Sequence, residues 1–353
     1  MDDYAKFLSD RIKKLTPYTA GEQPKERKYI KLNTNENPYP PTPKIMDAIQ
    51  AEINNLHLYP DPNSTELCEA VAKVENVGPE CVFCGNGSDE ILSFVFYSFF
   101  SSDPPLLFPD ITYSFYPVYA NYYDIKYKTV PLNDKFEIVA DDYMLPASGI
   151  IFPNPNAPTS VFLGRDKILR LAEYHLESVV AVDEAYIAFG GESMTEFVNK
   201  YPNLLVIKTL SKSHALAGIR AGFAIGQPHL VEALKRAKDS FNSYPIDRIA
   251  SAVAKSAILD AEYYKGINGR IIDTRENFVK KIKKLGFACT EPKSNFVFAT
   301  HESARAGDLY KKLKERGILV RYFDKRRIDN YLRITIGTDE NMDYLAEVLS
   351  GLV

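Results

Sequence analysis

The sequence predicts an α/β protein with a mostly parallel sheet between layers of helices, followed by a smaller α+β domain. The chain has 353 residues, and at roughly 150 residues per domain this length corresponds to about two domains. Between residues 81 and 225, short apolar runs alternate with segments of helical periodicity, which is typical of a parallel sheet covered by helices. After Pro245 the pattern changes to long helical segments that precede a few short strands.

We divide the chain into three parts on this basis. Residues 1–28 form an N-terminal arm with one amphipathic helical segment, and residues 29–245 form the large domain. Residues 246–353 form the small C-terminal domain. The strands expected in the large domain are the apolar runs CVFC, PLLF, IKYKTV, GIIF, VVAV, LLVI and AGFAI.

Composition excludes several classes of protein. The 43 basic and 46 acidic residues are spread evenly and give a net charge of -3, unlike the one-sided basic face of a nucleic-acid binder. The N-terminus lacks the cationic start and apolar core of a signal peptide. No apolar run approaches the roughly 20 residues that span a bilayer. We therefore expect a soluble cytoplasmic protein that binds neither nucleic acid nor membrane.

Four cysteines are present, at positions 68, 81, 84 and 289. The CxxC formed by Cys81 and Cys84 can indicate redox chemistry or half of a zinc site. However, CVFC is typical of a short buried strand, and no second Cys or His pair follows at ligand spacing. We expect reduced cysteines in the core and no metal site.

Ligands of parallel sheets bind at the carboxyl ends of the strands, so the residues after each apolar run are the candidates for a site. Asp183 ends the run VVAV, and Tyr186 follows three residues later. A carboxylate at a buried strand end is costly unless it meets a cation or strong donors. The alternative for Asp183 is a helix N-cap.

Three other strand ends carry polar or aromatic groups. GNGSDE precedes a helix and places Ser88 and Asp89 in its first turn, which suits an anion but is also ordinary capping. Tyr113 follows PLLF, where a ring can stack on a planar ligand or simply pack. The turn PNPNAPTS offers amide side chains, including that of Asn156.

The segment after LLVI gives the sharpest signal. Lys212 lies between Ser211 and Ser213, and Arg220 follows in a Gly-rich context. Lysine forms Schiff bases with aldehydes, while hydroxyls and guanidinium groups bind phosphate oxygens. Pyridoxal phosphate is the one ligand that also requires an anion at its ring nitrogen, a donor at its ring hydroxyl and an aromatic stacking partner. The strand ends together supply all of these groups.

The order DEAY, SKS, AGIRAG is similar to that of the fold-type I, pyridoxal-phosphate-dependent aminotransferases, and in particular resembles the histidinol-phosphate aminotransferases. The resemblance runs nearly end to end. The segments that carry it are LTPYTAGE, LNTNENP, LYPDP, GNGSDE, VDEAY, SKSHALAGIRAG and YLRITIG.

The resemblance implies a role for each matching residue. Lys212 would hold the cofactor as a Schiff base and move the proton, Asp183 would pair with the ring nitrogen, and Tyr186 would hold the ring hydroxyl. Tyr113 would stack on the ring. The phosphate would be bound by Ser88, Asp89 (through its N–H), Ser211, Ser213 and Arg220.

The resemblance also implies the substrate contacts and the assembly. Tyr59 would reach the cofactor phosphate of a neighbouring subunit, making the protein a homodimer with shared active sites. The substrate carboxylate or phosphate would be bound by Arg333, with Arg321, Tyr18 and Asn35 completing the substrate site.

One stretch departs from the family pattern. The family has Asn-Asn-Pro-Thr-Gly in the proline-rich turn, and its second Asn binds the cofactor's ring hydroxyl. Here the stretch is NAPTS, so Ala157 occupies that position and Ser160 replaces the Gly. Asn156 or a water molecule are the alternatives for this contact, whose loss costs roughly 0.5–1.5 kcal/mol.

The activity that the resemblance implies is transamination between L-histidinol phosphate and 2-oxoglutarate, giving imidazole-acetol phosphate and glutamate in histidine biosynthesis. A fold alone does not fix a substrate. The alternatives are a decarboxylase similar to threonine-phosphate decarboxylase, an aromatic-amino-acid aminotransferase, and a regulator that only binds the cofactor.

Overall fold

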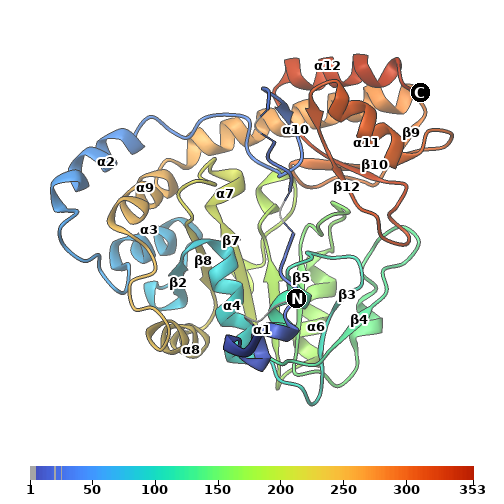
Figure 1. Ribbon diagram of the computed structural model, residues 1–353. Coiled ribbons are helices and arrows are strands. Elements are labelled where there is room, and N and C mark those ends of the chain that lie inside the picture. Colours follow the sequence, from blue (N-terminus) through green and yellow to red (C-terminus); the bar gives the residue numbers. More distant parts are fainter. Residues whose placement is uncertain (1–4, 20, 25) are drawn as a thin grey trace.

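A mixed seven-stranded sheet forms the centre of the protein, whose computed structural model describes residues 5–19, 21–24 and 26–353 (Figure 1). The predicted α/β class is therefore confirmed. Every apolar run predicted as a strand contributes one strand to this sheet. In sheet order the strands are β2 (Val82–Gly85), β8 (Gly222–Ile225), β7 (Leu204–Thr209), β6 (Val179–Asp183), β5 (Gly149–Pro153), β3 (Leu106–Pro109) and β4 (Tyr127–Val130).

All strands but one share a direction. The pairs β6–β7, β5–β6, β3–β5 and β3–β4 are parallel, whereas β8 is antiparallel to both of its neighbours, β7 and β2. The carboxyl ends of β2, β7, β6, β5 and β3 consequently meet at one edge of the sheet. This edge is where sequence analysis expects the ligand.

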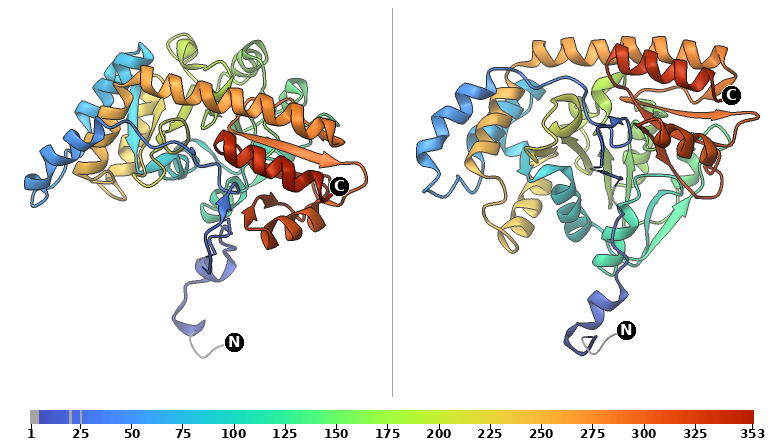
Figure 2. Two further views of the ribbon diagram at one scale, coloured as in Figure 1. Left: turned by 90° about the horizontal axis from the view of Figure 1, so that it is seen from above. Right: turned by 45° about the horizontal axis from the view of Figure 1, so that its top comes forward.

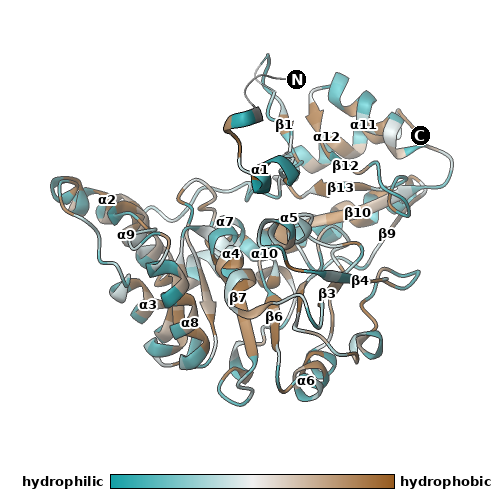
Figure 3. Cartoon of the chain, turned by 60° about the horizontal axis from the view of Figure 1, so that its bottom comes forward, coloured by the Kyte–Doolittle hydropathy of each residue, from teal (hydrophilic) through white to brown (hydrophobic). Residues whose placement is uncertain are grey.

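Helices cover both faces of the sheet. Successive strand residues point to opposite sides, so neighbouring residues of one strand pack against different sets of helices. Phe83, Ile151 and Leu205 face a core with α4 (Gly87–Phe99), α5 (Tyr116–Tyr122) and α8 (Pro228–Asp239). Val82 and Ile150 face the other core, with α3 (Thr65–Glu75), α6 (Arg165–Tyr174) and α9 (Arg248–Ile258). The central strands β6 and β7 are brown, that is hydrophobic, in Figure 3, as burial on both faces requires, whereas the edge strand β4 is hydrophilic and largely exposed.

The C-terminal part is built on a second sheet, drawn in orange and red in Figure 1. Its antiparallel strands, in order, are β12 (Arg321–Tyr322), β13 (Leu332–Thr335), β10 (Phe296–His301) and β9 (Phe287–Cys289). Its helices are α10 (Ala261–Lys284), α11 (Ala306–Glu315) and α12 (Asp339–Ser350). This is the α+β arrangement expected after Pro245.

The N-terminal segment reaches both parts of the protein. Its helix α1 (Asp10–Lys14) projects from the body in both views of Figure 2. Further along, β1 (Ile30–Lys31) pairs in parallel with β11 (Ile318–Leu319), which ties the start of the predicted large domain to the C-terminal part. Helix α2 (Ile45–Glu52) then returns to the large sheet's side of the molecule.

The core of the large sheet and the core of the C-terminal sheet meet along the helices that follow Pro245. Helix α9 packs on α2 and α3, so its Val253 belongs to the core of the large sheet. Ile267 of α10 lies in the same core, whereas Ile271 and Phe278 lie in the core of the C-terminal sheet. The division at residue 245 therefore stays a prediction, with α10 bridging the two cores. Among the described residues, no helix has the length and apolar character required to span a bilayer.

Candidate active site

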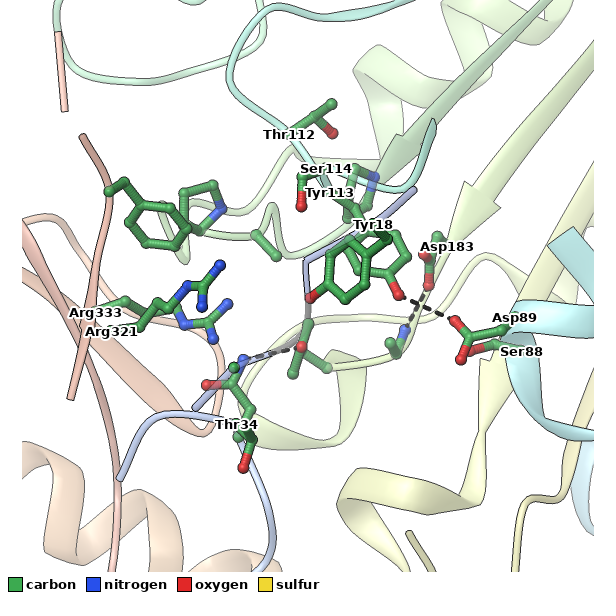
Figure 4. Close-up of a pocket in the computed structure, with 18 of the residues that line it drawn as sticks. Tyr18, Thr34, Ser88, Asp89, Thr112, Tyr113, Ser114, Asp183, Arg321 and Arg333 are labelled. Atoms are coloured by element: carbon green, nitrogen blue, oxygen red, sulfur yellow. Dashed lines mark hydrogen bonds between the residues drawn. The ribbon is translucent and has the colours of Figure 1, made fainter. Parts of the chain in front are cut away.

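A cavity of about 750 Å³ opens at the carboxyl ends of the large sheet, facing the C-terminal part (Figure 4). This volume lies within the range of small-molecule sites. Of the fifteen residues predicted for the site, twelve line the cavity. They are Tyr18, Asn35, Ser88, Asp89, Tyr113, Asp183, Tyr186, Ser211, Lys212, Arg220, Arg321 and Arg333.

Lys212 reaches the cavity from a single helical turn that follows β7. Thr209 caps this turn, α7 (Leu210–Ser213), by accepting a hydrogen bond from the Ser211 N–H at 3.2 Å. The Lys212 Nζ donates to the Thr34 carbonyl at 3.0 Å. Burial, together with the charge of Arg333, lowers the pKa of Lys212 from 10.5 to about 8. The neutral, nucleophilic amine is thus accessible close to physiological pH.

Asp183 ends β6 at the floor of the cavity and is 4% exposed. Its carboxylate accepts hydrogen bonds from the Tyr116 hydroxyl at 3.1 Å and from the Ala185 N–H at 3.2 Å. Neither donor is a cation, and burial raises the pKa of Asp183 to about 6. The carboxylate lines the cavity, so a cationic group of a ligand can supply the missing countercharge.

An anion cradle lies beside Asp183, where β2 leads into α4. Gly87 adopts a φ of +73°, and a Cβ atom there would lie 2.7 Å from Nη2 of Arg220. This arginine itself has a φ of 59°, and its Nη1 lies 3.3 Å from the Ser211 Oγ. Backbone donors at a helix start, a hydroxyl and a guanidinium therefore surround one space, which suits a phosphate group.

Asp89 links Arg220 of the anion cradle to Tyr113. Its Oδ2 accepts from Arg220 Nη2 at 2.9 Å, and its Oδ1 accepts from the Tyr113 hydroxyl at 3.0 Å. The pKa of Tyr113 is raised well above its usual value by burial and by the Asp89 charge, so the phenol stays protonated. Asp89 thereby fixes both the arginine and the tyrosine ring at the cavity wall.

Two guanidinium groups, those of Arg321 and Arg333, occupy the side of the cavity away from Asp183 and Ser88 (Figure 4). Arg333 Nη2 donates to the Asn33 carbonyl at 2.9 Å, while its buried Nε has no protein partner. Both groups lie over the ring of Phe323, whose centroid is 5.7 Å from the guanidinium carbon of Arg333 and 5.5 Å from that of Arg321. This pair gives the wall the charge needed to bind an anionic substrate group.

A hydrogen-bond chain orients Tyr186 next to Arg333. The Asn35 amide donates to the Tyr186 hydroxyl at 2.9 Å, and the Asn35 Oδ1 accepts from the Thr335 hydroxyl at 3.0 Å. Asn35 is 1% exposed, which leaves its side chain little freedom. The Tyr186 hydroxyl proton remains free to donate to a ligand.

Three predicted residues do not line the cavity. Ser213 forms a hydrogen bond with His214 Nδ1 at 2.9 Å, and the Asn156 amide donates to Ile111 O and Thr159 Oγ1. Tyr59 is 79% exposed on the outer surface, where its ring stacks on Tyr244. Their roles stay predictions.

Sequence reasoning missed two partners that complete the site. The Thr34 carbonyl, which accepts from Lys212, is a backbone group and has no side-chain signal. Tyr116, the donor to Asp183, begins α5 three residues after Tyr113, and this proximity in the sequence was the available signal. Ala157, at the place of the family's second asparagine, does line the cavity.

The cysteines were the other residues that the sequence offered for a site, either for redox chemistry or for binding zinc. Cys68, Cys81 and Cys84 are buried, as predicted, and all four cysteines are free thiols. Within the part of the chain that the structure describes, no three His, Cys, Asp or Glu side chains are placed to hold a metal ion.

Comparison with known proteins identifies the family of the chain. The family model for aminotransferase class I and II matches residues 27–349. Two curated histidinol-phosphate aminotransferases are each 51% identical: that of Clostridium beijerinckii over 98% of this chain and 97% of the relative, and that of Pseudomonas syringae over 99% and 100%.

Solved structures match the fold at lower identity. The histidinol-phosphate aminotransferase of Sinorhizobium meliloti, in complex with pyridoxal-5'-phosphate, has a TM-score of 0.87 at 22% identity and covers 98% of each chain. That of Clostridium acetobutylicum has a TM-score of 0.85 at 23% identity, covering 91% of this chain and 98% of that one. With the near-complete family match, these findings establish that the chain belongs to the aminotransferase class I and II family.

Proposed function

We propose that this protein transfers an amino group between L-histidinol phosphate and 2-oxoglutarate, forming imidazole-acetol phosphate and L-glutamate in histidine biosynthesis. The observation that carries the proposal is the meeting of an amine with a lowered pKa, Lys212, and an unneutralised buried carboxylate, Asp183, in one cavity. Relatives of the same length and about half identical sequence bear the name of this activity.

The residues present fit pyridoxal phosphate. Asp183 lacks a cationic partner and would hold a protonated ring nitrogen, while Lys212 would take the aldehyde. The phosphate would lie in the cavity against the start of α4, the Ser211 hydroxyl and the Arg220 guanidinium, which lies so close to Gly87 that a Cβ atom there would be 2.7 Å from Nη2. When bound, this cofactor supplies an aldehyde that exchanges amino groups and a ring that withdraws electrons from the substrate carbon.

The chain's own groups would then position the substrate and move protons. Lys212 Nζ, neutral in a substantial fraction of molecules near pH 8, would remove the proton from the carbon that bears the substrate's amino group and return it during the transfer. Tyr116 holds the Asp183 carboxylate in place through its hydroxyl. Tyr186, oriented by Asn35, would donate its hydroxyl proton to the cofactor's ring oxygen.

Substrate recognition falls to the wall opposite Asp183. Arg333 has an unpartnered buried Nε and would bind a carboxylate or phosphate oxygen there. Arg321 and Tyr18 line the same cavity and would complete the phosphate contact. A substrate with an anionic group at one end and an amine at the other suits this separation of Arg333 from Lys212.

We also propose that two copies form a homodimer with shared active sites. Tyr59 would extend from one copy toward the cofactor phosphate of the other. It is exposed and stacks on the exposed Tyr244, and Leu56, Leu58 and Phe241, which are near these two residues in the sequence, are also exposed. Burial of such side chains would stabilise association. A location in the cytoplasm fits a biosynthetic reaction on a phosphorylated metabolite.

The test is to mix the purified protein with L-histidinol phosphate and 2-oxoglutarate and to measure glutamate. Lys212→Ala should abolish glutamate formation, whereas Lys281→Ala, which removes an exposed amine paired with Asp343, should leave it unchanged. Borohydride should fix the cofactor on the peptide that contains Lys212. Release of carbon dioxide without glutamate would instead identify a decarboxylase, and turnover of Phe or Tyr alone would identify an aromatic-amino-acid aminotransferase.

A further inference from the structure

Two cysteines that play no part in the site described above lie next to each other. Cys68 on α3 and Cys84 on β2 have their sulfur atoms 3.5 Å apart, and their exposed fractions are 7% and 5%. The other two are separate: the Cys81 thiol lies 3.9 Å from Asn199 Oδ1, and Cys289 is on β9 of the C-terminal sheet. The neighbour of Cys84 is therefore Cys68, although Cys81 is closer to it in the sequence.

A second cavity gives small oxidants access to Cys68. It has a volume of about 720 Å³, lies among residues of α3, β2 and α8, and is lined by Cys68 and by Lys235. The hydrogen bond with Cys84 and the nearby charge of Lys235 lower the pKa of Cys68. The hydrogen bond with Cys68 and burial raise that of Cys84. Because Cys68 lines the second cavity and Cys84 does not, Cys68 is the member that an oxidant can reach and Cys84 is its partner.

We propose that Cys68 and Cys84 form a reversible redox site at which hydrogen peroxide makes a disulfide that loosens the anion cradle of the active site. The Cys68 thiolate attacks one peroxide oxygen, forming an S–O bond while the O–O bond breaks. Cys84 then attacks the oxidised sulfur, forming the S–S bond and releasing the oxygen as water. Overall, two thiols and one peroxide give one disulfide and two water molecules, and a thiol reductant reverses the change.

The coupling to the cradle follows from the position of Cys84 in the chain. Cys84 is the third residue of β2, whose last residue, Gly85, precedes Asn86, Gly87 and Ser88. An S–S bond of about 2.05 Å requires the sulfur atoms to approach by about 1.5 Å, which pulls β2 and α3 together.

The cradle has little room to absorb that movement. Gly85 pairs with Gly222, and a Cβ atom on Gly222 would lie 2.8 Å from the Ser88 nitrogen and 2.9 Å from the Gly87 carbonyl carbon. Close packing of this kind transmits displacement. The step from the disulfide to weaker cofactor binding rests on the proposed function, because it takes the cradle as the phosphate site.

The first experiment detects the bond itself. The full-length, cofactor-free protein is treated with one equivalent of hydrogen peroxide, its free thiols are alkylated, and its peptides are mapped by mass spectrometry. A Cys68–Cys84 linked peptide is expected in the wild type and in the matched control Cys81→Ser, and it should disappear after dithiothreitol. Cys68→Ala and Cys84→Ala should each lack it. A wild-type protein without this link, or with Cys81 or Cys289 oxidised equally fast, overturns the proposal.

The second experiment measures the coupling. The Kd of pyridoxal phosphate should rise roughly ten-fold on oxidation, as expected for loss of one hydrogen bond to a charged group, while that of pyridoxal, which lacks the phosphate, stays the same. The rise should occur in wild type and Cys81→Ser, not in Cys68→Ala. A linked protein that binds both compounds as before refutes the coupling. If the reduced protein binds the cofactor but forms no glutamate, the proposed function is wrong, whereas the redox site is not contradicted.

Discussion

Lys212 should destabilise the protein whenever the cofactor is absent, so Lys212→Met should make the cofactor-free protein more stable. Folding lowers the pKa of this amine from 10.5 to about 8. That shift of about 2.5 pH units corresponds to a cost of roughly 3 kcal/mol below pH 8, at 1.36 kcal/mol per unit. Methionine removes the cost and also the hydrogen bond to Thr34, worth about 1 kcal/mol. Because the cavity is open to water, we expect a net gain of about 1–2 kcal/mol at pH 7.

The gain should depend on pH with a definite sign. Below pH 8 the amine is protonated in both the folded and the unfolded wild type, and the full cost applies. Between pH 8 and 10.5 the unfolded chain binds more protons than the folded one, so the stability of the wild type rises with pH. The advantage of Lys212→Met should therefore shrink over this range and reverse near its upper end, where the cost of burying the charge has gone and only the loss of the hydrogen bond to Thr34 remains.

Lys208, four residues earlier on β7, provides the contrast. Its Nζ lies 2.7 Å from the Glu75 carboxylate and 3.7 Å from that of the buried Glu184. Lys208→Met leaves these carboxylates without a cation and should cost about 3 kcal/mol. Urea denaturation at pH 7 and pH 10 measures the free energy of unfolding of the wild type and of both variants. A Lys212→Met protein less stable than wild type at pH 7, or a stability difference that is the same at both pH values, would refute the reasoning.

Three further substitutions separate the parts of the site. Asp183→Asn should stabilise the cofactor-free protein by up to about 3 kcal/mol above pH 6, because folding raises the pKa of this carboxyl to about 6 and the buried carboxylate is costly there. The gain should fade as the pH falls from 6 to 4, and a difference in unfolding free energy that stays constant over this range would contradict it. Arg333→Gln should raise the KM for the anionic substrates roughly ten- to hundred-fold through loss of a charged hydrogen bond, with cofactor affinity unchanged; steady-state kinetics and cofactor titration test this, and an unaltered KM would exclude Arg333 from substrate binding. Gly87→Ala places a Cβ atom 2.7 Å from Arg220 Nη2 at a positive φ, so it should lower the Tm and weaken binding of pyridoxal phosphate but not of pyridoxal; equal weakening of both compounds would argue against a phosphate cradle.

The fold class and most of the site were predictable from local sequence. Each strand of the large sheet except the exposed edge strand β4 is a short, mostly apolar run, and a run buried on both faces is recognisable without knowing its neighbours. Once the strands are parallel, their carboxyl ends meet at one edge, so residues far apart in sequence, such as Ser88, Asp183 and Lys212, were expected together. The cavity brings all three together.

The direction of individual side chains was not predictable in the same way. Ser213 is one residue from Lys212 yet bonds to His214, and Asn156 is one residue from Ala157 yet bonds to Ile111. Adjacent positions on a turn point to different sides, and packing decides which of them faces the cavity.

The sequence by itself determined which groups reach the edge of the sheet, because strand periodicity and the residues that follow each strand are local properties of the chain. Only the tertiary structure decided what each group meets there. The Thr34 carbonyl lies 178 positions from Lys212, Tyr116 lies 67 positions from Asp183, and Cys84 contacts Cys68 and not its CxxC neighbour. Such partners are fixed by how helices and strands pack in space, and the pKa values that govern the chemistry depend on burial, which exists only after the chain has folded.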